Sequence, residues 1–241
     1  MKKVILFLSV IGAAFLMTSC LGDSETSYSG TPLSYIARTE SGVTYARTLD
    51  GLPITSQQIQ LQYPGDFVFI AYSWTESTNT ITEDGIYNAT VSEISDPIEQ
   101  TTLIPSDAPG LETELPLASF ESALYGGSYF GYHWICGYGY EKGDGIKKAL
   151  RFYHNIDEGS ENEIIIDVRL VDSSGTVDKD QSDVLVAVNL KQIHDHYSAS
   201  ISSSGSSKNL QVYFRYWRKK SDGTLELYKT PQSYIMTVTK E

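Results

Sequence analysis

The chain has 241 residues, and its 18 Lys and Arg against 30 Asp and Glu give a formal net charge of −12 at pH 7. This charge argues against a nucleic-acid-binding protein, because phosphate contacts require clustered Lys and Arg side chains. Hydrophobic residues make up 41% of the sequence, enough to bury a core, which argues against a globally disordered chain. Its two cysteines exclude a disulfide-rich scaffold and a multi-cysteine metal site.

The first 19 residues have the pattern of an export signal. Lys2 and Lys3 precede a mostly apolar run over 4–16, and small residues follow before Cys20. The run is too short for a membrane-spanning helix, which needs about 20 residues. Residues 16–20, LMTSC, resemble the lipobox of bacterial lipoproteins, in which the cysteine is acylated and becomes the first residue of the processed chain. The alternative is an ordinary cleaved signal in which Cys20 has no special role.

Acylation at Cys20 makes a lipid bilayer the first expected partner. Several acyl chains hold a protein firmly, since each buried methylene contributes about 0.8 kcal/mol. Removal of residues 1–19 takes away two lysines, so the processed chain carries 16 basic and 30 acidic residues, a net charge of −14. Residues 20–32 are rich in Gly, Ser, Thr and acids and predict a flexible tether.

The first half of the body predicts short β-strands, because apolar and polar residues alternate and no long stretch has a helical period. Strands are expected at 33–39, 43–49, 67–74 and 86–94. This number of short strands suits a small barrel of the OB type over residues 33–96. Residues 97–110 contain three prolines and little periodicity, and they predict a linker between two domains.

The second half, residues 111–241, predicts an antiparallel β-sandwich. Over 129–140 the even positions are large or apolar, whereas most odd positions are small or polar, as in a half-buried strand. Turn signals such as Asp222-Gly223 separate the apolar runs. The expected fold class is therefore all-β, with a small N-terminal OB-like barrel and a C-terminal antiparallel β-sandwich. Further alternating runs lie at 164–170, 184–190, 210–216 and 234–238.

The layout of the whole chain resembles the NigD-like lipoproteins of Bacteroidetes. That resemblance implies an OB-like domain followed by a β-sandwich domain, and an anchored location in the cell envelope, at the outer membrane on its periplasmic face or at the cell surface. It supplies no catalytic residues, and the family's association with bacteriocin immunity rests on naming and neighbourhood. The segments that carry the resemblance are CLGD (20–23), GDFVFIAY (65–72), YNATV (87–91), SYFGY (128–132), EIIIDVR (163–169) and VNL (188–190).

Cysteine and histidine offer few candidates for catalysis or metal binding. Cys136 lies on the large aromatic face of 129–140, which predicts a buried and inert thiol rather than a nucleophile. His194 and His196 are two residues apart and would share one face of a strand, as some metal ligands do. A third ligand would have to come from His133 or His154, so we favour a polar strand end over a metal site.

Acidic residues are numerous but do not form a recognised motif. Between 172 and 183 the carboxylates do not have the spacing of an EF-hand calcium loop, and Lys179 lies among them, so a solvated loop is expected. Many carboxylate pairs could be drawn for glycoside hydrolysis, and nothing marks two of them. We therefore expect no catalytic residue, no metal and no cofactor. The four acids of this segment are Asp172, Asp178, Asp180 and Asp183.

One basic cluster stands out at 215–220, RYWRKK. Tyr213, Arg215 and Trp217 would share the strand face opposite the core, where rings and a guanidinium suit stacking on a sugar or pairing with an anionic group. These three are the candidate ligand-binding residues. The alternative is a strand end whose cations extend into solvent.

Together these features predict a lipid-anchored, non-enzymatic interaction module of the cell envelope. Its expected partners are the bilayer and an unidentified envelope protein or glycan, and nucleic acid is not expected. Two alternatives stay open. One is a glycan-binding accessory lipoprotein that uses exposed aromatic residues, and the other, ranked last, is an envelope hydrolase.

Overall fold

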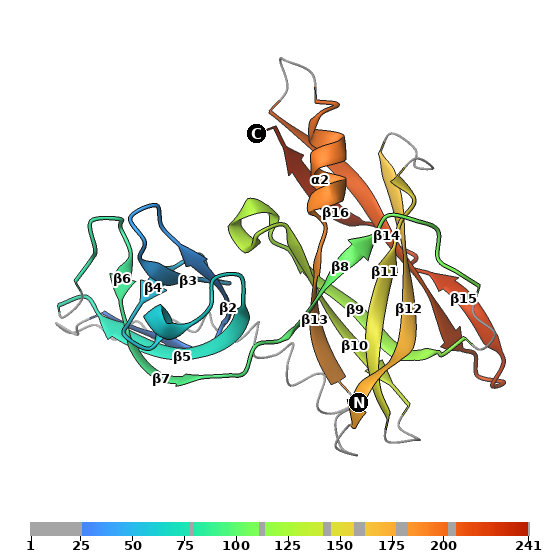
Figure 1. Cartoon of the computed structure of the whole chain (residues 1–241), viewed down its shortest axis with the longest axis horizontal. Coiled ribbons are helices and arrows are strands. Elements are labelled where there is room, and N and C mark those ends of the chain that lie inside the picture. Colours follow the sequence, from blue (N-terminus) through green and yellow to red (C-terminus); the bar gives the residue numbers. More distant parts are fainter. Residues whose placement is uncertain are drawn as a thin grey trace. The chain divides into compact units, whose positions relative to one another are not determined.

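The computed structural model describes residues 26–240 apart from 78–79, 111–113, 142–145, 157–161, 177–182 and 202–205. The chain divides into two compact units between Ile98 and Glu99. Both units consist mainly of β-strands (Figure 1). In the described part of the chain, no helix is long and apolar enough to cross a bilayer.

The first unit is a small barrel of seven strands (Figure 1). The strand order is β1-β5-β2-β3-β4-β6, with β7 paired to β5. Its core contains Ile36, Ile54, Val68 and Ile70, each with no exposed surface. The elements are β1 (Ser27–Gly30), β2 (Leu33–Arg38), β3 (Thr44–Thr48), β4 (Pro53–Thr55), the 3₁₀-helix η2 (Ile59–Leu61), β5 (Phe67–Thr75), β6 (Tyr87–Asn88) and β7 (Thr90–Ile94).

The strands expected at 33–39, 43–49 and 67–74 are present as β2, β3 and β5. The segment expected as one strand over 86–94 is divided at Ala89 into β6 and β7. Part of the predicted tether is also a strand, because residues 27–30 form β1 and pair antiparallel with β5. The ring of Tyr28 in β1 stacks on Trp74 in β5 with 4.3 Å between ring centroids. Pairing with β5 holds this short polar segment as a strand. Its own composition is that of a linker, so the sequence did not predict it.

The second unit is built on a nine-stranded sheet that curls until β12 and β14 pair with each other. The order is β12-β11-β8-β13-β10-β9-β14-β15, and β16 pairs with β14. The elements are β8 (Glu99–Ile104), β9 (Leu117–Tyr125), the 3₁₀-helix η3 (Gly127–Phe130), β10 (His133–Tyr140), β11 (Ile146–Tyr153), β12 (Glu163–Thr176), β13 (Asp183–Asn189), α2 (Lys191–Ser198), β14 (Ser207–Lys219), β15 (Leu225–Lys229) and β16 (Tyr234–Thr239).

Strand β8 occupies most of the first half of the segment predicted as a linker, 97–110. It pairs in parallel with both β11 and β13, so it belongs to the sheet of the second unit. Its sequence, EQTTLI, is largely polar, and only Leu103 in it is buried. The sequence pattern missed this strand because parallel pairing on both sides, and not an apolar face, holds it in place. The second domain, predicted as an antiparallel β-sandwich, therefore also contains parallel strand pairs.

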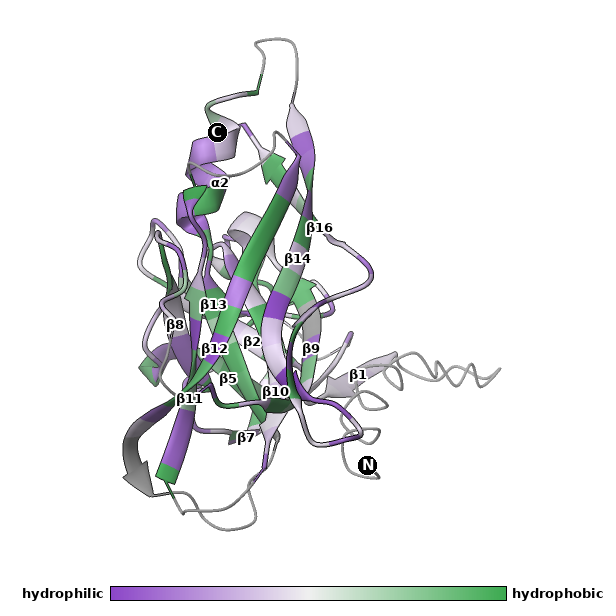
Figure 2. Ribbon diagram, turned by 90° about the vertical axis from the view of Figure 1, so that its right-hand side faces the viewer, coloured by the Kyte–Doolittle hydropathy of each residue, from purple (hydrophilic) through white to green (hydrophobic). Residues whose placement is uncertain are grey.

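The half-buried strand predicted over 129–140 is present only from His133, as β10, and it is buried on both faces. Trp134, Cys136 and Tyr138 lie in the core of the second unit. Phe130 is also buried, but it comes from η3, and Gly131 and Tyr132 have the left-handed φ values of 58° and 65° that turn the chain into β10. Figure 2 shows the alternation of apolar and polar residues as green and purple bands along the long strands of this unit.

A short helix replaces the strand end predicted around His194 and His196. Helix α2 buries Ile193, His194 and Tyr197 and packs on β16 and β14. Eight residues are too few for a clear helical period in the sequence, and an isolated helix of this length is marginal in water. The all-β fold class, with a barrel and a second β domain, is confirmed with this one addition among the described residues.

Candidate functional site

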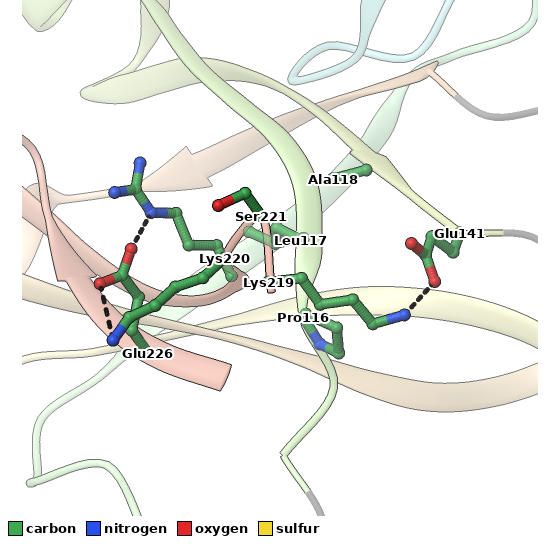
Figure 3. Close-up of a pocket in the computed structure, with 9 residues that line it drawn as sticks. Pro116, Leu117, Ala118, Glu141, Lys219, Lys220, Ser221 and Glu226 are labelled. Atoms are coloured by element: carbon green, nitrogen blue, oxygen red, sulfur yellow. Dashed lines mark hydrogen bonds and ion pairs between the residues drawn. The ribbon is translucent and has the colours of Figure 1, made fainter. Parts of the chain in front are cut away.

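A pocket of about 620 Å³ lies at the end of β14 in the second unit (Figure 3). One wall is apolar and comes from the start of β9. The other walls carry charged side chains from the end of β14, from β15 and from the residue after β10. The lining residues are Pro116, Leu117, Ala118, Glu141, Arg218, Lys219, Lys220, Ser221 and Glu226.

Strand pairing and a tight turn bring these residues together. Arg218 in β14 is in register with Leu117 of β9 on one side and with Glu226 of β15 on the other. The turn between β14 and β15 is closed by Asp222, whose Oδ1 accepts hydrogen bonds from the backbone N and the Oγ1 of Thr224 at 2.9 and 2.6 Å. Gly223 has a φ of 85°, which favours glycine at this position. The turn therefore folds β15 back so that Glu226 faces the cations of β14.

The charged side chains form ion pairs within the pocket. Nε of Arg218 donates to Oε1 of Glu226 at 2.7 Å, and Nζ of Lys220 lies 3.8 Å from Oε2 of the same carboxylate. Lys219 pairs with Glu141 (Figure 3). The hydrogen bond to Glu226 is the main cause that raises the pKa of Arg218. Because these groups are well exposed, the pairs orient side chains more than they stabilise the fold.

Tyr213, Arg215 and Trp217 lie on the face of β14 opposite the core, where the alternation placed them, but they do not line this pocket. Arg215 donates to Asp167 through one edge of its guanidinium, with Nε–Oδ1 at 2.7 Å and Nη2–Oδ2 at 2.6 Å. Nζ of Lys229 lies 3.8 Å from the ring centroid of Tyr213. Nε1 of Trp217 is buried with no hydrogen-bond partner in the described part of the chain. Tyr213 and Arg215 therefore interact with side chains of their own domain.

Part of the pocket lining, residues 218–221, follows directly after the three predicted ligand-binding residues. Arg218, Lys219 and Lys220 belong to the basic cluster noted in the sequence. The sequence pattern did not identify their acidic neighbours, Glu141 and Glu226, because strand pairing and folding bring them to the cluster. The Asp222-Gly223 turn signal was the one clue that β15 returns beside β14.

The histidines are used within the fold at separate places. Nδ1 of His133 bonds the carbonyl oxygen of Phe130 at 3.0 Å, and Nδ1 of His154 bonds that of Ile165 at 2.9 Å. Burial lowers the pKa of both imidazoles. Nε2 of His194 accepts from a backbone N–H in β16. Within the residues that the structure describes, no three His, Cys, Asp or Glu side chains form a group suited to a metal ion.

The predicted acidic loop and the lipidation site lie partly or wholly outside the described residues. Cys20, Asp178 and Asp180 fall in segments that the structure does not describe. Asp172 in β12 pairs with Lys148 in β11. Of the segment predicted as a tether, 20–32, the structure describes only residues 26–32.

Cys136 is fully buried in the core of the second unit, and burial raises the pKa of its thiol. We expect it to react with a thiol reagent about 10³-fold more slowly than an exposed cysteine, because reaction requires an opening of the core. The measurement is stopped-flow labelling of a Cys20→Ser chain, native and in denaturant. Adding Ser106→Cys, at an exposed position, supplies the fast reference. Equal rates for the two cysteines in the native protein would contradict the prediction.

Comparison with family models gives no match, and comparison with curated proteins gives no significant match. A solved structure of an uncharacterised protein from Parabacteroides merdae superposes with a TM-score of 0.60 at 16% identity, over 90% of this chain and 99% of that one. A NigD-like immunity protein from Bacteroides caccae gives 0.53 at 12% identity, over 91% of this chain and 100% of that one. The chain has a NigD-like fold.

A third structure with this fold comes from Bacteroides fragilis and is described as a candidate lipoprotein, with a TM-score of 0.52 at 9% identity, over 90% of this chain and 99% of that one. Identities this low establish a shared fold alone. The NigD-like fold nevertheless agrees with the layout that the sequence resembled.

Proposed function

We propose that this protein is a NigD-like lipoprotein, anchored in the cell envelope through acylated Cys20, and that it acts as a non-catalytic interaction module. The observation that carries the proposal is the lipobox-like segment 16–20 in a chain with a NigD-like fold. A structural neighbour described as a candidate lipoprotein supports it. We place the protein at the outer membrane, on the periplasmic face or at the cell surface.

The charge arrangement in the pocket supports binding over catalysis. Glycoside hydrolysis needs two carboxyl groups that are both available to the substrate. Glu141 and Glu226 are instead each engaged in an ion pair with a cation of the pocket. Cys136, the one cysteine in the described part of the chain, is buried away from the pocket. The expected partner is therefore an envelope protein or a glycan that the domains bind without chemical change.

Metabolic labelling with an alkyne-bearing fatty acid tests the anchor. The wild-type protein is expected to carry the label and to partition into a detergent phase, whereas Cys20→Ser is expected to lose both properties completely. Cys136→Ser is the matched control, since it removes the other cysteine and should keep the label. A labelled Cys20→Ser protein, or an unlabelled wild type, would overturn the proposal.

A glycan-binding role is the second candidate, and the first unit provides an observation in its favour. A groove of about 320 Å³ is lined by the stacked rings of Tyr28, Trp74 and Tyr87, together with Glu76. Aromatic rings beside a hydrogen-bonding carboxylate suit a sugar. In a glycan-binding assay, a loss on Trp74→Ala would locate binding in this groove, and a loss on Trp217→Ala would locate it on the outward face of β14.

A further inference from the structure

We propose that the pocket at the end of β14 binds a compact ligand through one oxyanion group, a carboxylate or a phosphate, and that Arg218 is the residue that recognises it. The proposal specifies the ligand of the interaction module proposed above. It does not depend on the lipid anchor, so the binding experiment and the acylation experiment can fail independently.

Arg218 is held in a fixed orientation that leaves part of its guanidinium free. Its guanidinium carbon lies 3.5 Å from the ring centroid of Tyr228, which holds one face of the plane. Its Nε donates to Glu226, which holds one edge. The two Nη nitrogens have no partner in the part of the chain that the structure describes. Paired N–H donors on a planar guanidinium match the two oxygens of a carboxylate or phosphate, and a fixed side chain loses less entropy on binding.

Two further donors lie beside Arg218. The 3.8 Å between Nζ of Lys220 and Oε2 of Glu226 exceeds a hydrogen-bond length, so the ammonium keeps donors available for a ligand. The hydroxyl of Ser221 neither donates nor accepts a hydrogen bond among the described residues. With three cations and two carboxylates on its walls, the pocket has an excess of positive charge within a chain of net charge −12. Local positive potential attracts an anion that the rest of the surface repels.

The remaining wall indicates what the oxyanion is attached to. Pro116, Leu117 and Ala118 supply an apolar surface, and in Figure 3 Pro116 and Leu117 lie between Glu226 on one side and Glu141 on the other. A volume of about 620 Å³ is within the range of small-molecule sites. The ligand is thus an oxyanion on a small carbon body, of the size of an acidic monosaccharide or a sugar phosphate.

The geometry favours Arg218 over Arg215, the cation first considered from the sequence. Arg215 already has the bidentate carboxylate partner that its guanidinium suits, Asp167. An incoming anion that used both Nη nitrogens would have to share Nη2 with this largely buried carboxylate. At Arg218 the carboxylate partner uses Nε alone, so a ligand can bind without breaking that contact.

The test is an NMR titration of the ¹⁵N-labelled protein at constant ionic strength with three probes: glucuronate, inorganic phosphate and uncharged glucose. Saturable shifts of the backbone amides at 117–118, 218–221 and 226 are expected with at least one anion and not with glucose. The anion that saturates the site distinguishes a carboxylate from a phosphate ligand. Equal shifts with glucose, or no saturable shift with either anion, would overturn the proposal.

Variants separate recognition by Arg218 from general charge effects. Arg218→Gln is expected to weaken binding about tenfold, the effect of losing a charge-assisted contact. Arg218→Lys keeps the charge but loses the paired donors, so it should also weaken binding and remains informative if the glutamine variant misfolds. Arg151→Gln removes one exposed charge from the same unit outside the pocket and should bind as wild type. Equal weakening by the Arg151 variant would contradict a specific site.

Discussion

Replacement of Trp134 by alanine is expected to lower the free energy of unfolding of the second unit by about 3–5 kcal/mol, the usual cost of removing a large buried aromatic side chain. Trp134 is 2% exposed. Its ring makes edge contacts with Phe214 and Tyr234, at centroid distances of 5.5 and 6.2 Å, and a tilted contact with Tyr125 at 5.4 Å. The substitution leaves a cavity between β10, β14 and β16 that these rings cannot fill.

Urea unfolding followed by circular dichroism measures this change. Trp134→Phe keeps an aromatic ring in the cavity and should be less destabilising than the alanine variant. Ile235→Ala is the surface control, because Ile235 is 55% exposed, and it should change stability by about 0.5 kcal/mol or less. If the free energy of unfolding of Trp134→Ala lay within about 1 kcal/mol of the wild-type value, the packing of Trp134 would not contribute as predicted to the stability of the core.

Removal of Arg215 is expected to destabilise the protein by about 2–3 kcal/mol, because it leaves the carboxylate of Asp167 without its bidentate partner. The side chain of Asp167 is 10% exposed, and its other cationic contact, Nη1 of Arg169, lies at the longer distance of 3.4 Å. The side chain of Arg215 is more exposed than that of Asp167. The expected loss of stability is therefore smaller than for a fully buried ion pair. The pair also joins β12 to β14, where the two residues are in register.

A double-mutant cycle with Arg215→Gln and Asp167→Asn isolates the energy of this pair. We expect a coupling energy of about 1–3 kcal/mol. The matched control is the Arg218–Glu226 pair on β14 and β15, which is more exposed on its acidic side and should couple by about 1 kcal/mol or less. A larger coupling energy for the Arg218–Glu226 pair than for the Arg215–Asp167 pair would contradict this prediction.

The parts of the fold that could be predicted are those in which one strand carries its own signal. Over β10, β12 and β14 apolar side chains repeat with a period of two for many residues, which is enough to predict the strands. Burial follows that period in β14, whereas β10 and the middle of β12 are buried on both faces. Strand β8 and helix α2 could not be predicted in the same way. The strand is polar and held by two neighbours, and the helix has eight residues, so neither shows a sufficient periodic pattern.

The candidate site was predicted only in part, for a related reason. The basic cluster at 215–220 and the outward face of Tyr213, Arg215 and Trp217 are visible in the sequence, since both depend on neighbouring residues of one strand. The partners of these residues are not visible. Asp167 reaches Arg215 through the pairing of β12 with β14, and Glu141 reaches Lys219 from 78 residues away.

The sequence alone determined the all-β class, the buried thiol at Cys136 and the expectation of an acylated Cys20, because each depends on residue types close together along the chain. Only the tertiary structure decided which cation is available to a ligand. Arg215 and Arg218 lie three residues apart on one strand. The first faces a carboxylate that binds it bidentately, and the second faces one that uses Nε alone. That difference comes from the strands paired on either side of β14, which local sequence does not specify.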